Sequence, residues 1–188
     1  GRREATGRGC MFVTRSALQK LGLPIAGSRV VVQGFGNVGS IAAELMAKEG
    51  MKILAVSDHT GGVYNPKGLD VAEVIRYVAE NRVLEGYPNA DAISNADLLE
   101  LECEVLVPAA LEGVIDEKNV DRIRARTIAE VANGPIEGSV DARITQPPWR
   151  EMRFVASEDL VLHTHKRPFE LPRRSVLFRP GDAVQIHD

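Results

Sequence analysis

The sequence contains few of the residues that mark several special protein classes. Only two cysteines, Cys10 and Cys103, occur in 188 residues, too few and too isolated for a disulfide framework or a Cys-x-x-Cys zinc site. No segment approaches the roughly 18 consecutive apolar residues of a membrane span. The formal net charge is −3, so no excess of basic side chains favours nucleic acid or an anionic membrane. We therefore expect neither as a partner.

Other absences limit where in the cell we expect the protein and which reactions it could catalyse. The start, Gly1 to Glu4, has no apolar signal segment, so we expect a cytoplasmic protein with packed, unreactive thiols. Gly-x-Ser-x-Gly, His-Glu-x-x-His and Walker-type sequences do not occur, which leaves nucleophilic, metal and phosphoryl-transfer chemistry without support. His163, His165 and His187 have no acidic or cysteine partner at a supporting spacing, and we interpret them as ordinary histidines rather than metal ligands.

What is present is a globular composition, 44% apolar and 26% charged, with a regular pattern up to Pro135. Short β-branched runs predict buried strands at 28–33, 51–57, 103–107 and 127–131. Apolar stripes at helical spacing predict helices at 9–21, 37–50, 70–81 and 116–126 and a shorter one from 95, and turn residues predict a hairpin or loop at 61–68. This alternation predicts an α/β fold with a Rossmann-type doubly wound, mainly parallel sheet.

A glycine-rich segment, Gly-Phe-Gly-Asn-Val-Gly at 34–39, follows the first predicted strand and begins the first crossover helix. Gly34 permits a tight turn, Gly36 lets the backbone approach a pyrophosphate, and Gly39 lets the helix pack closely on the strand. The start of the helix offers unpaired N–H groups and a partial positive charge to the phosphates. In this context the spacing predicts a dinucleotide site; the alternative is a simple turn.

Asp58 ends the second predicted strand, about 20 residues beyond the glycines, where dinucleotide sites place an acid on the adenosine ribose. Its negative charge would repel a 2′-phosphate, so NAD is favoured over NADP. The alternative is that Asp58 only caps a loop.

Five segments in order then resemble the cofactor-binding domain of the glutamate dehydrogenases. They are Glu-Ala-Thr-Gly-Arg-Gly at 4–9, Gln-Gly-Phe-Gly-Asn-Val-Gly-Ser at 33–40, Asn-Pro-Lys-Gly-Leu-Asp at 65–70, Val-Pro-Ala-Ala-Leu-Glu at 107–112 and Glu-Val-Ala-Asn-Gly-Pro at 130–135. The leucine and phenylalanine dehydrogenases share this fold, but the segment at 65–70 resembles the glutamate branch.

The resemblance implies a homohexameric enzyme that interconverts L-glutamate with 2-oxoglutarate and ammonia by hydride transfer at the nicotinamide. Thr6 and Asn37 would touch the dinucleotide, and Ala109, Ala110 and Asn133 would lie on its nicotinamide-ribose side. Without the resemblance, Thr6 would be interpreted as a helix N-cap, Asn37 as a helix-start residue and Asn133 as a loop residue. The cofactor-binding residues we expect are Thr6, Gly34, Phe35, Gly36, Asn37, Val38, Gly39, Asp58, Ala109, Ala110 and Asn133.

The resemblance also implies that the catalytic groups are absent from this chain. In the family, a separate N-terminal domain supplies the substrate lysines and the proton-moving aspartate. We therefore expect this segment to bind NAD without turning over glutamate. A different class, a non-catalytic nucleotide-binding or sensing module, remains the alternative.

The chain changes character at Ile136. Residues 1–135 form the expected dinucleotide-binding domain, whereas 136–188 hold half of the ten prolines and do not resemble the family's C-terminus. Strands are conceivable only at 153–156, 160–165 and 176–179, because prolines interrupt the rest. Our hypothesis is that this tail is a shifted-frame or recombined sequence, poorly packed or disordered.

Overall fold

The computed structural model describes residues 5–132, 135–137, 152–156, 160–164 and 176–178. The expected site residue Asn133 lies outside this part of the chain, as do His165 and His187. Within the described ranges, no helix is both long and apolar enough to cross a membrane.

The described helices and strands follow one another in the expected alternation. Their bounds are α1 Ala5–Lys20, β1 Arg29–Gln33, α2 Asn37–Lys48, β2 Lys52–Asp58, β3 Gly61–Tyr64, α3 Val71–Asn81, β4 Asp91–Ile93, α4 Asn95–Leu99, β5 Val105–Pro108, the 3₁₀ helix η2 Val120–Arg122, β6 Thr127–Glu130, β7 Met152–Ala156, β8 Leu160–Thr164 and β9 Val176–Phe178.

All the strands belong to one sheet, in the order β4-β3-β2-β1-β5-β6-β7-β8-β9. The five strands β2, β1, β5, β6 and β7 run parallel to one another, while β3 and β4 are added antiparallel at one side of this group and β8 and β9 at the other. The chain moves outward from β1 to β2 on one side and later returns to place β5 on the other side. The strand order therefore reverses at β1, where an open α/β sheet opens its ligand crevice.

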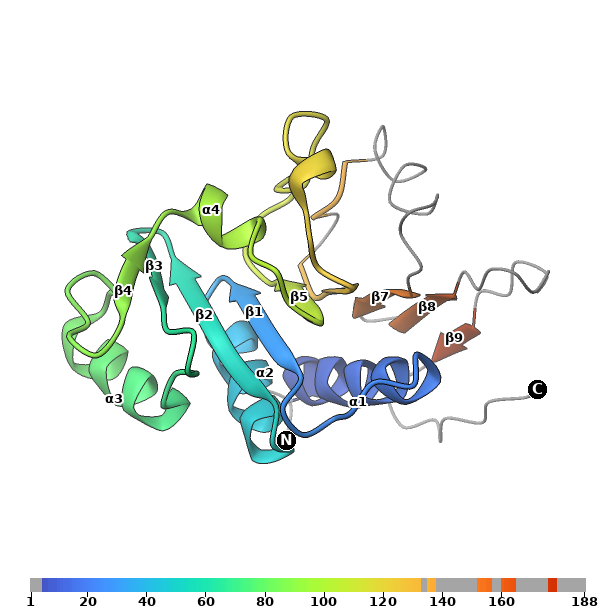
Figure 1. Cartoon of the computed structure of the whole chain (residues 1–188), viewed down its shortest axis with the longest axis horizontal. Coiled ribbons are helices and arrows are strands. Elements are labelled where there is room, and N and C mark those ends of the chain that lie inside the picture. The colour runs from blue at the N-terminus through green and yellow to red at the C-terminus, as the bar shows by residue number, and fades with distance from the viewer. Residues whose placement is uncertain (1–4, 133–134, 138–151, 157–159, 165–175, 179–188) are drawn as a thin grey trace.

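Helices cover both faces of the sheet (Figure 1). Along β1, Val30 and Val32 belong to a core shared with α1, α2 and α3. Val31 points to the other face and packs in a second core with residues of α4 and η2. This alternation is the two-residue period of a strand, and both faces of β1 are buried, which suits the three valines at its centre. The predicted doubly wound α/β fold is confirmed.

Most predicted elements are confirmed with small shifts at their ends. Asp70 caps α3 as predicted, because its carboxylate accepts a hydrogen bond of 3.0 Å from the Glu73 backbone N–H. The stretch at 61–68 contains β3, which pairs antiparallel with β2. Three stretches of the tail do form the strands β7, β8 and β9. Most of 136–188 lies outside the described residues, so the domain division at 135 and the origin of the tail stay predictions.

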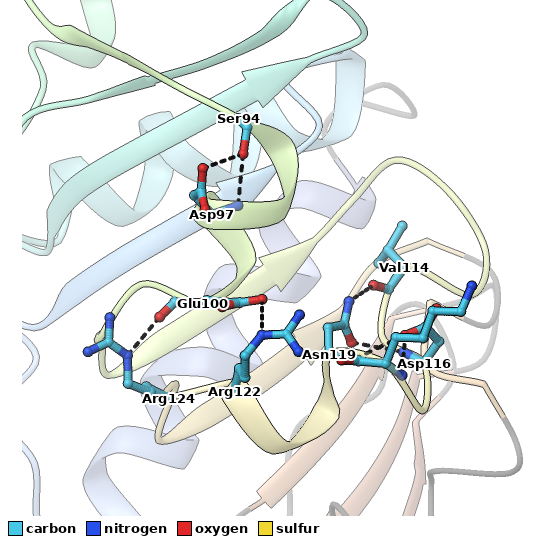
Figure 2. Close-up of polar contacts among 9 residues, drawn as sticks. Ser94, Asp97, Glu100, Val114, Asp116, Asn119, Arg122 and Arg124 are labelled. Atoms are coloured by element: carbon cyan, nitrogen blue, oxygen red, sulfur yellow. Dashed lines mark hydrogen bonds and ion pairs between the residues drawn. The ribbon is translucent and has the colours of Figure 1, made fainter.

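The predicted helix at 116–126 is wrong: only the 3₁₀ turn η2 forms there. The carboxylate of Asp116 accepts hydrogen bonds from the backbone N–H groups of Lys118 and Asn119, and the Asn119 side chain bonds back to Asp116 N and to the Val114 carbonyl (Figure 2). These are the contacts of a helix N-cap, and Val120 N–H also donates to the Asp116 carbonyl, but the backbone becomes extended at Ile123 (φ −67°, ψ 120°) and the helix goes no further. A single turn is therefore enough to bury Val120 and Ile123 in the second core.

Two further details were not anticipated in the sequence. The three-residue strand β4 was missed because it is too short to show a period. Arg122 and Arg124 are exposed, and they donate to the carboxylate and to the backbone carbonyl of Glu100, respectively, each at 2.8 Å (Figure 2). These bonds fasten the segment before β6 to the end of α4.

The two cysteines are packed, as predicted. Both are free and fully buried. Burial raises the pKa of each thiol to about 12, so both are protonated at neutral pH and neither is activated as a nucleophile.

Candidate functional site

The carboxyl ends of β1, β2, β5 and β6 are joined by backbone hydrogen bonds into one edge. The N–H groups of Gly34 and Phe35 both donate to the Ser57 carbonyl, and Ala109 N–H donates to the Gln33 carbonyl at 2.7 Å. Val131 and Ala132 N–H groups donate to the Pro108 carbonyl. The loops that follow these strands therefore start from fixed positions, as a preorganised site requires.

Gly34 and Gly39, two of the three motif glycines, are required by the packing of the protein itself. At Gly34 the φ angle is +100°, and an added Cβ would lie 2.7 Å from the Ala110 Cβ. At Gly39 an added Cβ would lie only 1.8 Å from the Gly34 carbonyl oxygen. The glycines thus let the turn after β1 touch both the loop after β5 and the helix α2.

Gly36, the middle glycine, differs from these two. A Cβ added there would meet nothing within 4 Å, and its φ of −81° is one that any residue adopts. No feature of the described protein therefore demands glycine at this position. The open space beside Gly36 lies at the carboxyl edge of the sheet and at the start of α2, so it fits a group that approaches the backbone closely.

The start of α2 is left free to bind a negatively charged group. Gly36 is its N-cap and, without a side chain, satisfies none of the first N–H groups. The first turn contains no acidic residue, so no carboxylate of this turn opposes the partial positive charge of the helix end. Gly36 and Asn37 are exposed, and Val38 is half-buried.

Asp58 lies at the end of β2, as predicted, but its carboxylate already has partners. One oxygen accepts hydrogen bonds from the backbone N–H (2.7 Å) and the hydroxyl (2.5 Å) of Thr60, and the other accepts from Leu84 N–H at 2.8 Å. Burial alone would raise the pKa of Asp58, but these hydrogen bonds outweigh it and lower the pKa below its ordinary value. The side chain is therefore an anion at neutral pH.

The remaining expected residues lie in three places. Ala109 and Ala110 follow β5 beside the glycine turn, the first half-buried and the second exposed. Thr6 is half-buried in the first turn of α1. Phe35 is 6% exposed and packs in the core, so only its backbone faces the site. The structure brings the turn residues and Ala110 together; the position of Asn133 is not described.

Several buried polar side chains at the same edge of the sheet were not predicted from the sequence. The side-chain oxygens of Gln33, Ser57 and Asn95 are buried and have no hydrogen-bond partner in the described part of the chain. Gln33 and Ser57 are paired residues at the ends of β1 and β2, and Asn95 donates to the Asp58 carbonyl at 3.0 Å. Glu130, 1% exposed, ends β6. The available signal was a polar residue at the end of the apolar runs of β1, β2 and β6.

Comparison with known proteins gives consistent results. A family model described as glutamate/leucine/phenylalanine/valine dehydrogenase matches residues 1–147. A glutamate dehydrogenase of Thermotoga maritima is 49% identical over 142 residues, which cover 75% of this chain and 34% of that protein.

Solved structures show the same relationship. The hetero-hexameric glutamate dehydrogenase of Thermus thermophilus, in its leucine-bound form, matches with a TM-score of 0.73 and 36% identity over 80% of this chain and 35% of its own. The glutamate dehydrogenase of Peptoniphilus asaccharolyticus matches with a TM-score of 0.65 and 29% identity over 81% and 35%. The chain thus spans about a third of the length of these relatives.

Proposed function

The chain belongs to the glutamate/leucine/phenylalanine/valine dehydrogenase family, and from this premise we propose that it is the NAD-binding part of a glutamate dehydrogenase. The glutamate branch is favoured by the 49% identity to the Thermotoga maritima enzyme, since the family model itself covers four amino acids. The reaction would be the oxidative deamination of L-glutamate to 2-oxoglutarate and ammonia.

The observation that carries the proposal is the open space at Gly36. Among the motif glycines, Gly34 and Gly39 are explained by close contacts with the protein, whereas Gly36 has nothing within 4 Å of an added Cβ. A ligand that must approach the backbone at this point explains the glycine. The uncapped start of α2 next to it supplies N–H donors and a partial positive charge, which suit a pyrophosphate.

The other residues of the edge fit the rest of a dinucleotide. A carboxylate has about four acceptor positions, of which three on Asp58 are used by Thr60 and Leu84, so one remains for a ribose hydroxyl. Its negative charge disfavours a 2′-phosphate and hence NADP. Ala109, Ala110 and Asn133 would lie on the nicotinamide side, and Thr6 would contact the dinucleotide from α1.

The bound cofactor would accept the hydride, and this chain would position it. The chain spans about a third of the relatives' length, and we assign no general acid or base to it. We therefore propose that the chain alone binds NAD without deaminating glutamate. Because the Thermus thermophilus relative is hetero-hexameric, a hexamer is the proposed assembly of the whole enzyme.

The proposal is tested by titrating the 188-residue chain with NAD and NADP in a calorimeter, alongside Gly36→Ala. The added methyl group meets no protein atom, and the entropy gain of Gly→Ala opposes the poorer helix-capping of alanine, so we expect little change in unfolding stability. It fills the space of the pyrophosphate, however, and should weaken NAD binding about 10-fold or more, the cost of losing a charge-assisted contact. Lys48→Ala, at the exposed far end of α2, is the matched control and should bind like the wild type.

Two results would contradict the proposal. One is a folded wild-type chain that binds neither coenzyme. The other is a Gly36→Ala variant that binds NAD as tightly as the wild type, which would leave the open space without a function.

A further inference from the structure

The first turn of α1 lies unusually close to α2, and a glycine makes this possible. A Cβ added at Gly7 would lie 2.7 Å from the Cγ2 of Ile41, 3.0 Å from the Cβ of Ile41 and 3.1 Å from the backbone nitrogen of Ala42. Two of these three atoms are fixed to α2 and cannot rotate away. Any larger residue at position 7 must therefore push the two helices apart.

Helix propensity does not explain this glycine. Gly7 is buried within α1, and glycine is a poor helix former, so alanine would stabilise the helix if the helix alone mattered. Packing against α2 accounts for its presence.

The close contact has a consequence for the neighbouring Thr6. Ile41 lies about one helical turn beyond Asn37, the first residue of α2. Further along both helices, Arg15 of α1 pairs with Glu49 at the end of α2 at 3.6 Å, so the two helices run in the same direction. Thr6, which precedes Gly7, therefore lies toward the start of α2, where Gly36 and Asn37 are exposed. The separation of α1 from α2 thus sets how far the Thr6 hydroxyl is from a ligand bound there.

We propose that Gly7 is a positioning residue for the dinucleotide: by lacking a side chain it holds α1 at the distance from which the Thr6 hydroxyl reaches the bound cofactor. The inference rests on the proposed function. Gly7 itself touches no ligand and acts through Thr6. Since a hydrogen bond weakens steeply as its atoms separate, a shift of a few tenths of an ångström in α1 is enough to weaken the bond.

The test is a double-mutant cycle on the full 188-residue chain, with NAD affinity measured by calorimetry for the wild type, Gly7→Ala, Thr6→Val and the double variant. We expect Gly7→Ala to weaken NAD binding about 3- to 10-fold, the range of one hydrogen bond. In the Thr6→Val background, where the hydroxyl is already gone, Gly7→Ala should change the affinity less than about 2-fold.

A rescue variant separates positioning from general damage to the fold. Ile41→Ala removes the Cγ2 atom closest to the new methyl group, so Gly7→Ala combined with Ile41→Ala should regain part of the lost affinity. This pair is compared with Ile41→Ala alone, which keeps the test valid where Gly7→Ala does not fold by itself. Thermal unfolding of each variant shows which chains are folded.

The outcomes separate the two proposals. A wild-type chain that binds neither NAD nor NADP contradicts the proposed function and this inference with it. If the wild-type chain binds NAD, two results overturn only the role of Gly7. One is that Gly7→Ala has no effect on NAD affinity; the other is that it weakens NAD binding equally whether position 6 is Thr or Val. An unchanged affinity in Thr6→Val overturns it as well.

Discussion

The two edges of the parallel sheet differ in what their polar groups bind. At the amino edge, the guanidinium of Arg29 donates to Glu104 at 2.8 and 3.0 Å and to Glu102 at 3.1 Å. The Arg29 backbone N–H donates to the same Glu104 carboxylate at 2.7 Å. The charged groups of this cluster therefore pair with one another within the protein.

The carboxyl edge has the opposite character. The start of α2 has no side-chain cap, the space beside Gly36 is open, and the buried oxygens of Gln33, Ser57 and Asn95 have no partner in the described residues. The amino edge has one such oxygen, on Thr127. At the amino edge, most polar groups named here are thus hydrogen-bonded within the protein. At the carboxyl edge, where open α/β sheets bind ligands, several polar groups stay available.

The variant with the largest expected effect tests whether the structure of the carboxyl edge also depends on close packing within the protein. In Gly39→Ala the new Cβ would lie 1.8 Å from the Gly34 carbonyl oxygen, so the turn after β1 must move. We expect a loss of about 3 kcal/mol or more of unfolding free energy, at the upper end for overpacked sites. Urea denaturation measures it, with Gly36→Ala as the matched control that should keep wild-type stability. Equal stability of the two variants would remove the distinction between the glycines.

The next prediction concerns the charge at the carboxyl edge. Asp58→Asn keeps the shape of the side chain but removes the anion, so NAD binding should weaken by about 1.5 to 3 kcal/mol, the value of a hydrogen bond to a charged group. The preference against NADP should become smaller at the same time. Calorimetry with both coenzymes checks this, and Asp91→Asn, exposed at the start of β4, serves as the control. An unchanged NAD-to-NADP affinity ratio would show that Asp58 only holds Thr60 and Leu84.

Local sequence signals predicted the parts of this edge that depend on neighbouring residues. The β-branched run of β1, the glycines that follow it and the acid that ends β2 are each recognisable within a few positions, because turn and strand preferences are local. The order of these elements was enough to predict the doubly wound sheet; the dinucleotide site at its carboxyl edge stays a prediction.

The sequence could not reveal contacts between distant segments. Leu84 N–H reaches the Asp58 carboxylate from 26 residues away, and the closeness of Ala110 to Gly34 depends on the packing of two loops. The helix predicted at 116–126 failed for a related reason. Asp116 caps a helical turn, but the chain becomes extended at Ile123 and Arg126 N–H donates to the distant Cys103 carbonyl. Local apolar spacing does not reveal that contact.

The smallest expected effect concerns the ion pairs of the amino edge. Burial alone would raise the pKa of Glu104, but the hydrogen bonds and the charge of Arg29 outweigh it and hold the pKa below its ordinary value. A carboxylate with a lowered pKa stabilises the folded state above its unfolded pKa of about 4.3, and this stabilisation is lost as the pH falls through the lower folded value.

Arg29→Met should therefore cost about 1 to 2 kcal/mol at pH 7, discounted because the Arg29 side chain is 36% exposed. The difference from the wild type should shrink below about pH 4, since protonated Glu104 no longer needs the cation. NAD affinity should not change, because Arg29 lies at the edge opposite the glycines. Urea denaturation between pH 7 and 3.5 tests the first two points, with Arg76→Met on the exposed side of α3 as control. A stability difference that stays constant with pH, or a loss of NAD binding, would mean that the two edges are not independent.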